Sequence, residues 1–185
     1  NFQMPGRGSA GSISVYGYDG ASTTASEVRL LNGGIVTTES QGPGRGGSIS
    51  VLAQNLTINS GAGILATTSG AGEAGTIAIM APALTMSQGQ IATGTTATGN
   101  AGAITLNVGQ LIATESAQVS SNSTFGGSTA GRAGTITIQG VNGTAGSATS
   151  VSLDNSTINT TIDGGTSLTT PATIDITAQT VNLTN

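Results

Sequence analysis

The aliphatic residues of this chain recur in one short pattern. In each of six copies a pair of small residues (Pro-Ala in the last) is followed, after one further residue, by an isoleucine and, two positions later, by a second aliphatic residue. Because successive side chains of a strand point to opposite faces, this alternation predicts a series of short strands with one apolar face each. The pattern reads AGSISV at 10–15, GGSISV at 46–51, AGTIAI at 74–79, AGAITL at 101–106, AGTITI at 133–138 and PATIDI at 171–176.

Each unit also contains a second and a third short strand. Between them lie turn residues such as Asn32-Gly33, which tolerate left-handed backbone conformations. The second strand carries the aliphatic residues Val28, Leu30, Leu56, Ile58, Leu84, Met86, Leu111, Ala113, Val151, Leu153, Val181 and Leu183. The third strand is centred on Ile35, Ile64, Ile91, Val119 and Ile158.

Three strands per unit, with matching apolar positions in every unit, predict a parallel β-helix. Such a fold is all-β, and each coil stacks on the next at about 4.8 Å. We expect one segment over residues 1–185, with about six three-strand coils and a core made of aliphatic columns. The two columns of the first strand are Ile13, Ile49, Ile77, Ile104, Ile136 and Ile174, and Val15, Val51, Ile79, Leu106, Ile138 and Ile176.

A longer repeat is superimposed on the coils. The first and fifth units both carry extra residues between their first two strands. A cassette of four coils, from about residue 8 to 130, is therefore partly repeated at 131–185. Copying of this kind suits a structural spacer better than an enzyme, because a catalytic site needs one unique place.

The composition removes most catalytic chemistry. Only 6% of the residues are charged, the net charge is −4, and the chain has no Lys, His, Cys or Trp. Imidazole bases, thiolate nucleophiles and His/Cys metal sites are thereby excluded, and we expect no catalytic residue, cofactor or metal. The acidic balance argues against nucleic acid, and no apolar stretch is long enough for membrane insertion. Asp154, Asp163 and Asp175 form the one local concentration of carboxylates, and we interpret them as solvated surface.

The repeated blocks resemble the filamentous haemagglutinin-like exoproteins of two-partner secretion systems. The resemblance rests on GTIAI at 75–79, LTMSQGQI at 84–91 and GTITI at 134–138. It implies a right-handed β-helix, secretion through an outer-membrane partner and a place at the bacterial cell surface or outside the cell. It also implies a structural or adhesive filament, which contacts itself and glycans of a host, a neighbouring cell or the extracellular matrix.

Two other classes of function remain open. One is a polysaccharide-acting β-helix enzyme, a lyase or hydrolase, and the other is an ice-binding solenoid that uses a Ser/Thr face. The simplest interpretation of that face is a solvated surface, followed by contact between fibres. Tyr16 and Tyr18 are expected to cover the apolar patch of the first insertion. The outward hydroxyl residues are Ser14, Ser50, Thr76, Thr105, Thr135 and Thr137.

Two further expectations concern register and assembly. Arg45 and Glu73 occupy equivalent positions in adjacent coils, so they are expected to form an ion pair. The last unit ends after the strand of Val181 and Leu183, whereas Phe2 and Met4 have the pattern of a third strand. The two ends are therefore complementary, either because subunits stack end to end or because the chain is one period of a longer one.

Overall fold

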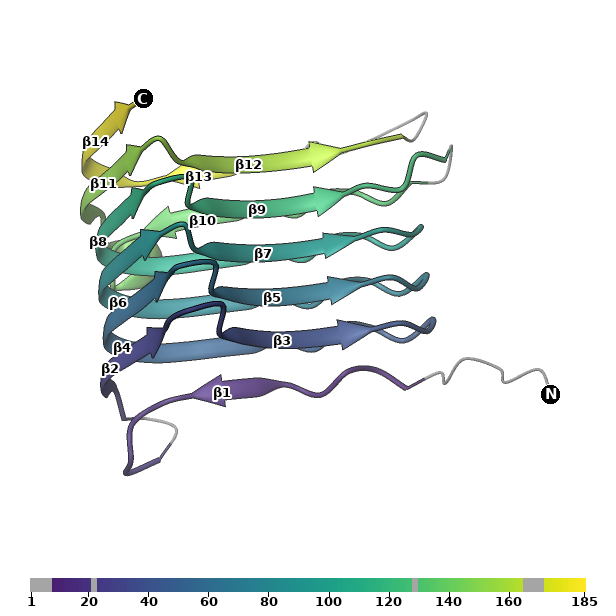
Figure 1. The fold of residues 1–185 in the computed structure, drawn as a ribbon, viewed down its shortest axis with the longest axis horizontal. Helices are drawn as coiled ribbons and strands as arrows, with labels where there is room; N and C mark the ends of the chain where they lie inside the picture. The colour runs from purple at the N-terminus through teal and green to yellow at the C-terminus, as the bar shows by residue number, and fades with distance from the viewer. Residues whose placement is uncertain (1–7, 21–22, 128–129, 165–171) are drawn as a thin grey trace.

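The computed structural model describes residues 8–20, 23–127, 130–164 and 172–185. The chain winds into parallel coils stacked along one axis (Figure 1). The described residues form five complete coils and two sides of a sixth. The coils are, in order, β1 (Ile13–Val15), β2 (Ala25–Leu30) and β3 (Ile35–Ser40); β4 (Ile49–Asn59) and β5 (Gly63–Thr68); β6 (Ile77–Ser87) and β7 (Gln90–Thr95); β8 (Ile104–Thr114) and β9 (Gln118–Ser123); β10 (Ile136–Gln139), β11 (Ala148–Asp154) and β12 (Thr157–Ile162); and β13 (Ile174–Ile176) and β14 (Ala178–Thr184).

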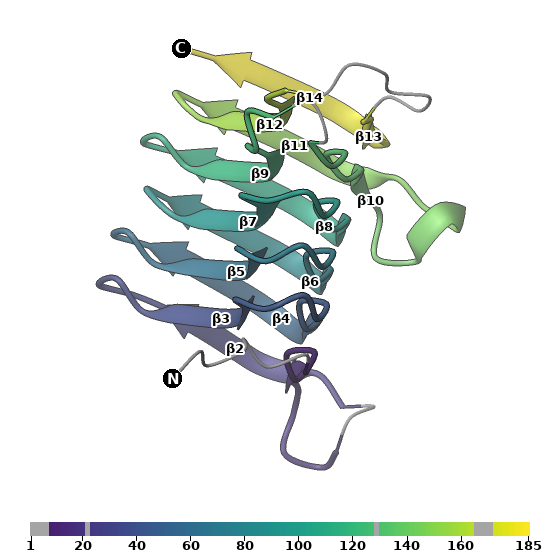
Figure 2. The same cartoon turned by 90° about the vertical axis from the view of Figure 1, so that its right-hand side faces the viewer.

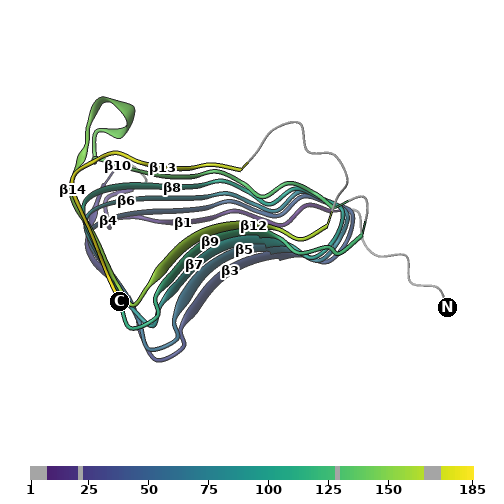
Figure 3. The ribbon, with the colours of Figure 1, turned by 90° about the horizontal axis from the view of Figure 1, so that it is seen from above.

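The strands form two parallel sheets. One sheet has the order β1-β4-β6-β8-β10-β13, with β2, β11 and β14 joined to it, and the other has the order β12-β9-β7-β5-β3. Seen from above, each coil turns around three sides (Figure 3). The expected first and second strands are continuous in coils two to four, where they form the single long strands β4, β6 and β8. In these coils the chain keeps the strand conformation through the bend between the first and second sides. Each coil therefore has the three predicted sides, but the first two belong to one continuous strand.

The expected register of the first side is confirmed. Ile49 pairs with both Ile13 and Ile77, and Ile77 pairs with Ile104. Ile136 continues the column to Ile174, and the neighbouring valine, isoleucine and leucine column follows the same register. Ile77 is 1% exposed and Ile104 is fully buried. Equivalent aliphatic residues therefore lie in columns along the axis, and these columns form the core. The second side stacks in the same way through Leu56, Leu84 and Leu111, with Val28 below them and Val151 and Val181 above.

The placement of Ile35 in the third-side column was wrong. Ile35 pairs with Gly63 and is 49% exposed, whereas Val36 pairs with Ile64 and continues the column through Ile91. A shift of one residue moves a strand side chain to the opposite face. Two adjacent β-branched residues suit either face equally, so the sequence alone did not fix which of them points inward. The rest of this column, Ile91, Val119 and Ile158, has the expected register.

The corner between the second and third sides uses left-handed backbone in every complete coil. Asn32 and Asn155 have φ values of 53° and 45°, as their residue type favours. Ser60, rather than the preceding asparagine, takes this conformation in coil two, and Gln88 takes it in coil three. The N–H of Ser60 donates to the carbonyl of Ser87 in the next coil, at 3.0 Å. Hydrogen bonds between coils therefore hold residues in a conformation that their own propensity does not specify.

The interior of the third side is partly polar, which the sequence did not indicate. Thr38 donates its hydroxyl hydrogen bond to the carbonyl of Gly47 at 2.7 Å, and Thr93 donates to that of Gly102 at 2.6 Å. Both threonines are buried. Buried carbonyl groups need donors, and these hydroxyls supply them where the chain passes from one coil to the next. The third side thus fastens its coil to the following corner by hydrogen bonds as well as by aliphatic packing.

The corner that leads into the first strand requires glycine in coils two to five, whereas the sixth coil has Ala172 at this position. A Cβ atom at Gly75 would overlap the carbonyl oxygen of Gly47, and one at Gly102 would overlap that of Gly75. Gly47 and Gly134 face the preceding coil in the same way. The glycine before the first strand of coils two to five is therefore a steric requirement of close stacking. Gly11 occupies the same position in the first coil, and a Cβ there would meet nothing within 4 Å.

Replacing Ile77 by Asp should unfold the centre of the stack. The change removes a buried aliphatic side chain and places an unpaired carboxylate in the core, so we expect a loss of at least about 3 kcal/mol. Urea unfolding followed by circular dichroism measures it. Thr76→Asp, at the exposed neighbouring position, is the control and should change little; equal stability of both variants would contradict the core assignment.

Replacing Gly75 by Ala should destabilise the fold, whereas Gly11→Ala should not. The first change forces a methyl group against the backbone of the preceding coil, which we expect to cost roughly 1–3 kcal/mol. The second places the same methyl group in open space, so we expect a change within about 0.5 kcal/mol. Thermal unfolding of the two variants beside the unaltered chain compares them, and an equal effect at both positions would contradict the steric explanation.

Candidate functional site

The last coil exposes residues that belong to the core columns. Ile174 and Ile176 are 40% and 36% exposed, and Val181 and Leu183 are 46% and 69% exposed. Their partners one coil below, Ile136, Ile138, Val151 and Leu153, are buried. Among the described residues, β13 and β14 each pair with a strand on one side only. The last coil therefore presents an apolar surface and an unpaired strand edge, both of which invite addition of a further strand.

The opposite end is open in the same sense. Ile13, Val15 and Val28 belong to the core columns of coil one but are only partly buried. Their strands, β1 and β2, pair with β4 alone within the described residues. The other residues expected at this end, Phe2 and Met4, lie outside the described residues.

The expected ion pair between Arg45 and Glu73 is present. Arg45 Nη2 lies 3.1 Å from Glu73 Oε2, and the two side chains are 74% and 45% exposed. Asn100 Nδ2 donates to Glu73 Oε1 at 3.3 Å, and the N–H of Arg132 donates to Asn100 Oδ1 at 2.9 Å. The pair is thus part of a polar ladder that crosses four consecutive coils. Its exposure to solvent keeps its contribution to stability small.

The hydroxyl face of the first side is irregular. Ser14, Ser50, Thr105 and Thr137 stack in one column, but Ala78 separates Ser50 from Thr105. Asp175 follows Thr137 in that column at the last coil. In the neighbouring column, Thr76 donates to Ser48 at 3.1 Å and Thr173 donates to Thr135 at 3.4 Å. Thr105, Thr135 and Thr137 are half-buried, whereas Ser14, Ser50 and Thr76 are exposed. The face is therefore not a uniform array of free hydroxyl groups.

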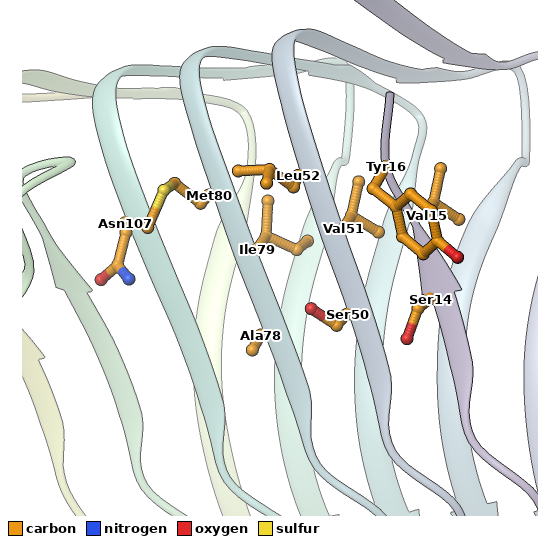
Figure 4. A pocket seen from close by; sticks show the side chains of 10 residues that line it. All are labelled: Ser14, Val15, Tyr16, Ser50, Val51, Leu52, Ala78, Ile79, Met80 and Asn107. Carbon is orange, nitrogen blue, oxygen red and sulfur yellow. The ribbon is translucent and has the colours of Figure 1, made fainter. Parts of the chain in front are cut away.

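A groove of about 380 Å³ runs across the corner between the first and second sides (Figure 4). We call it the corner groove. Leu52 pairs with Met80, and Met80 pairs with Asn107, so these side chains form one outward column over three coils. Tyr16 closes the groove at coil one. The sequence carries a signal for this column that the core prediction did not include. Leu52 and Met80 each follow an inward aliphatic residue and therefore break the alternation of apolar and polar residues. The complete lining is Ser14, Val15, Tyr16, Ser50, Val51, Leu52, Ala78, Ile79, Met80 and Asn107.

Both insertions begin at the corner that carries the corner groove, and the coil-one insertion extends below coil one (Figure 1). The coil-one insertion comprises residues 17–24, of which 21 and 22 are outside the described part, and the coil-five insertion comprises residues 140–147 and contains the 3-10 turn Gly143–Ala145. Tyr18 in the coil-one insertion is fully exposed, so the expectation that it covers an apolar patch of its own insertion was wrong. Tyr16 is 44% exposed at the edge of the groove.

The three aspartates of the C-terminal concentration, Asp154, Asp163 and Asp175, are all exposed. Asp154 accepts a hydrogen bond from Thr184 at 3.0 Å, and Asp175 accepts one from Thr173 at 3.2 Å. In the described part of the chain, no group of three or more His, Cys, Asp or Glu side chains is placed to hold a metal ion. A second hollow of about 180 Å³, on the third side, is lined by Gln90, Asn122 and neighbouring small residues. Neither this hollow nor the corner groove is lined by a carboxylate.

Comparison of the chain with protein families, with curated proteins and with solved structures found no match. The resemblance to filamentous haemagglutinin-like exoproteins therefore stays a prediction. Within the described ranges, no helix has the length and apolar character needed to cross a membrane.

Replacing Glu73 by Gln should have a small, salt-dependent effect. The amide removes the charge attraction to Arg45, so we expect a loss below about 1 kcal/mol that shrinks as ionic strength rises. Urea unfolding at low and high salt measures it. Glu39→Gln, at an exposed position on β3, is the matched control and should show no such dependence. A salt-independent loss above about 2 kcal/mol would contradict a surface ion pair.

Proposed function

We propose that this chain is a non-catalytic structural β-solenoid, a segment or building block of an extracellular bacterial filament or surface fibre. The observation that carries the proposal is the uncovered core at the last coil. Ile174, Ile176, Val181 and Leu183 continue buried columns but remain exposed, so a further coil with the same pattern would complete them.

The uncovered coil supplies the driving force for stacking. Complete burial of an aliphatic side chain contributes roughly 1.5–3 kcal/mol, so covering these four partly exposed residues contributes about 1 kcal/mol each. The unpaired edges of β13 and β14 would add a ladder of backbone hydrogen bonds. The covering coil is that of a second copy stacked end to end or of a longer chain with the same repeat.

Secretion and adhesion are further parts of the proposal. They rest on the resemblance, which implies an outer-membrane secretion partner, a cell-surface location and contact with glycans of other cells or of the matrix. The low charge and the hydroxyl-rich surface suit contacts between neighbouring fibres, because few like charges oppose their approach. A structural rather than catalytic role is supported by the absence of carboxylates from the lining of both hollows.

The double variant Val181→Glu/Leu183→Glu should abolish end-to-end assembly. Two charges on the exposed columns would be buried without partners in a stacked coil, whereas the isolated chain keeps them in solvent. Electron microscopy and small-angle X-ray scattering at increasing concentration should show lengthening rods for the unaltered chain and single segments for the variant. Asn182→Glu, at the exposed position between the two residues, is the matched control and should still assemble.

Gly11→Ala tests the other end independently. The methyl group of the alanine would meet no atom within 4 Å in the isolated chain. In a stacked rod it would face the backbone of the coil added below coil one, as a Cβ atom at Gly75 faces Gly47. We therefore expect normal stability and impaired rod growth. Rods as long as those of the unaltered chain in both Gly11→Ala and Val181→Glu/Leu183→Glu would overturn the proposal, and the absence of rods of the unaltered chain would overturn end-to-end stacking of separate copies.

A further inference from the structure

The outer face of the third side carries the second hollow, at the level of coil three. β5, β7 and β9 lie one above the other in consecutive coils (Figure 2), and the third side bows toward the first, so its outer face is concave (Figure 3). Ala92 pairs with Ser120, and both point outward because the residue before each belongs to the inward column. Ala92 is nevertheless only 8% exposed and Ser120 only 4% exposed. These two outward residues therefore lie at the floor of the hollow, which has a volume of about 180 Å³.

Gly94 opens this hollow. It lies inside β7 and pairs in register with Thr67 below it and Asn122 above it, so the strand has no bulge there. Its φ is not positive, and a Cβ atom at Gly94 would approach only the carbonyl oxygen of Asn122, at 3.1 Å. Glycine weakens a strand, and where no bulge or left-handed turn requires it, it often marks the close approach of a ligand. Here the missing side chain leaves a space between Thr67 and Asn122.

Polar groups without partners face the space. The hydroxyl of Ser120 lines the hollow and makes no hydrogen bond within the described part of the chain. A buried hydroxyl is normally hydrogen-bonded, so this one calls for a partner from outside the chain. Asn122 Oδ1 accepts the N–H of Thr161 at 3.0 Å, which orients the amide and leaves its Nδ2 group as a donor. Gln90 adds a second amide at the side of the hollow.

The lining selects the class of ligand. Among the described residues, no charged and no aromatic side chain lines the hollow. A bound phosphate, sulfate or carboxylate would therefore lack a cationic partner. Hydroxyl groups both donate and accept, so the hydroxyls of a sugar match the amides and hydroxyls of this lining. The volume lies below the roughly 300–1,000 Å³ of sites for drug-sized ligands, so the hollow has room for a single sugar ring.

We propose that this hollow binds one residue of an uncharged glycan. The sugar ring lies over Gly94 and Ala92, and its hydroxyls form hydrogen bonds with Ser120 and Asn122. The site gives the proposed glycan contact a place on the chain, and its biological meaning rests on that proposed function. In a fibre that repeats the hollow, many weak sites would bind one glycan together. The site itself does not depend on how the fibre assembles.

Nuclear magnetic resonance titration tests the site. The isotope-labelled chain carries Val181→Glu/Leu183→Glu, which prevents rods, and the probes are the methyl glycosides of glucose, galactose, mannose and N-acetylglucosamine. With at least one of them we expect saturable shifts of the Gly94, Ser120 and Asn122 amide signals at millimolar concentrations, as befits a small single site. Glucuronic and galacturonic acid should bind at least about tenfold more weakly than the matching neutral sugars, because the lining offers no cation.

Two variants separate the site from the fold. Gly94→Thr fills the hollow with the residue that coil two has at the equivalent position, and threonine suits a strand. We expect a stable chain with sugar binding weakened at least about tenfold. Ser120→Ala removes the unpartnered hydroxyl and should weaken binding about tenfold without loss of stability. Ala83→Thr, on the second side of the same coil, is the matched control and should bind as the parent does.

Three results would overturn the glycan site. They are the absence of saturable shifts with all of the neutral sugars, equal binding by the parent and Gly94→Thr, and tighter binding of the acidic sugars than of the neutral ones. None of them bears on rod formation by the unaltered chain, which electron microscopy follows separately, so failure of the glycan site and failure of end-to-end assembly remain distinguishable.

Discussion

The close stacking of coil on coil is the constraint from which the rest of the structure follows. Backbone ladders fix the distance between coils at about 4.8 Å, which leaves no room for a Cβ atom where Gly75 faces Gly47 or Gly102 faces Gly75. Glycine at this corner fixes how coils two to five lie over the coils before them. Once this placement is fixed, Ile77 must lie over Ile49, and the variable loops are confined to the corners.

The sequence predicted most where a residue meets its own equivalent in the next coil. The columns through Ile49 and Leu56 were readable because burial on both sides selects the same residue type in each repeat. Ile35 was misplaced because two adjacent β-branched residues leave the face undetermined. The left-handed backbone of Gln88 and the inward hydroxyl of Thr38 were also unreadable, since hydrogen bonds between coils determine them rather than local propensity.

The corner groove shows a different limit of sequence reasoning. Leu52 and Met80 break the strand alternation, but only the register shows that they lie beside each other on the outside of one corner. The same register places Gln139, which precedes the coil-five insertion, beside Asn107 in that column. A surface that depends on several coils has no signature in any single repeat, whereas a core column is visible in each one.

The exposed surfaces follow from the same stacking that builds the core. A coil is stable because its neighbours cover its columns and pair its strands, so the last coil necessarily presents Ile174 and Leu183 uncovered and two edges unpaired. The corner between the first and second sides need not be covered by a neighbouring coil, because its side chains point away from the stack. Insertions at this corner do not disturb the stacking. In the proposed filament, the addition of a further coil would therefore follow from the repeat itself, whereas the corner between the first and second sides can vary without cost to the fold.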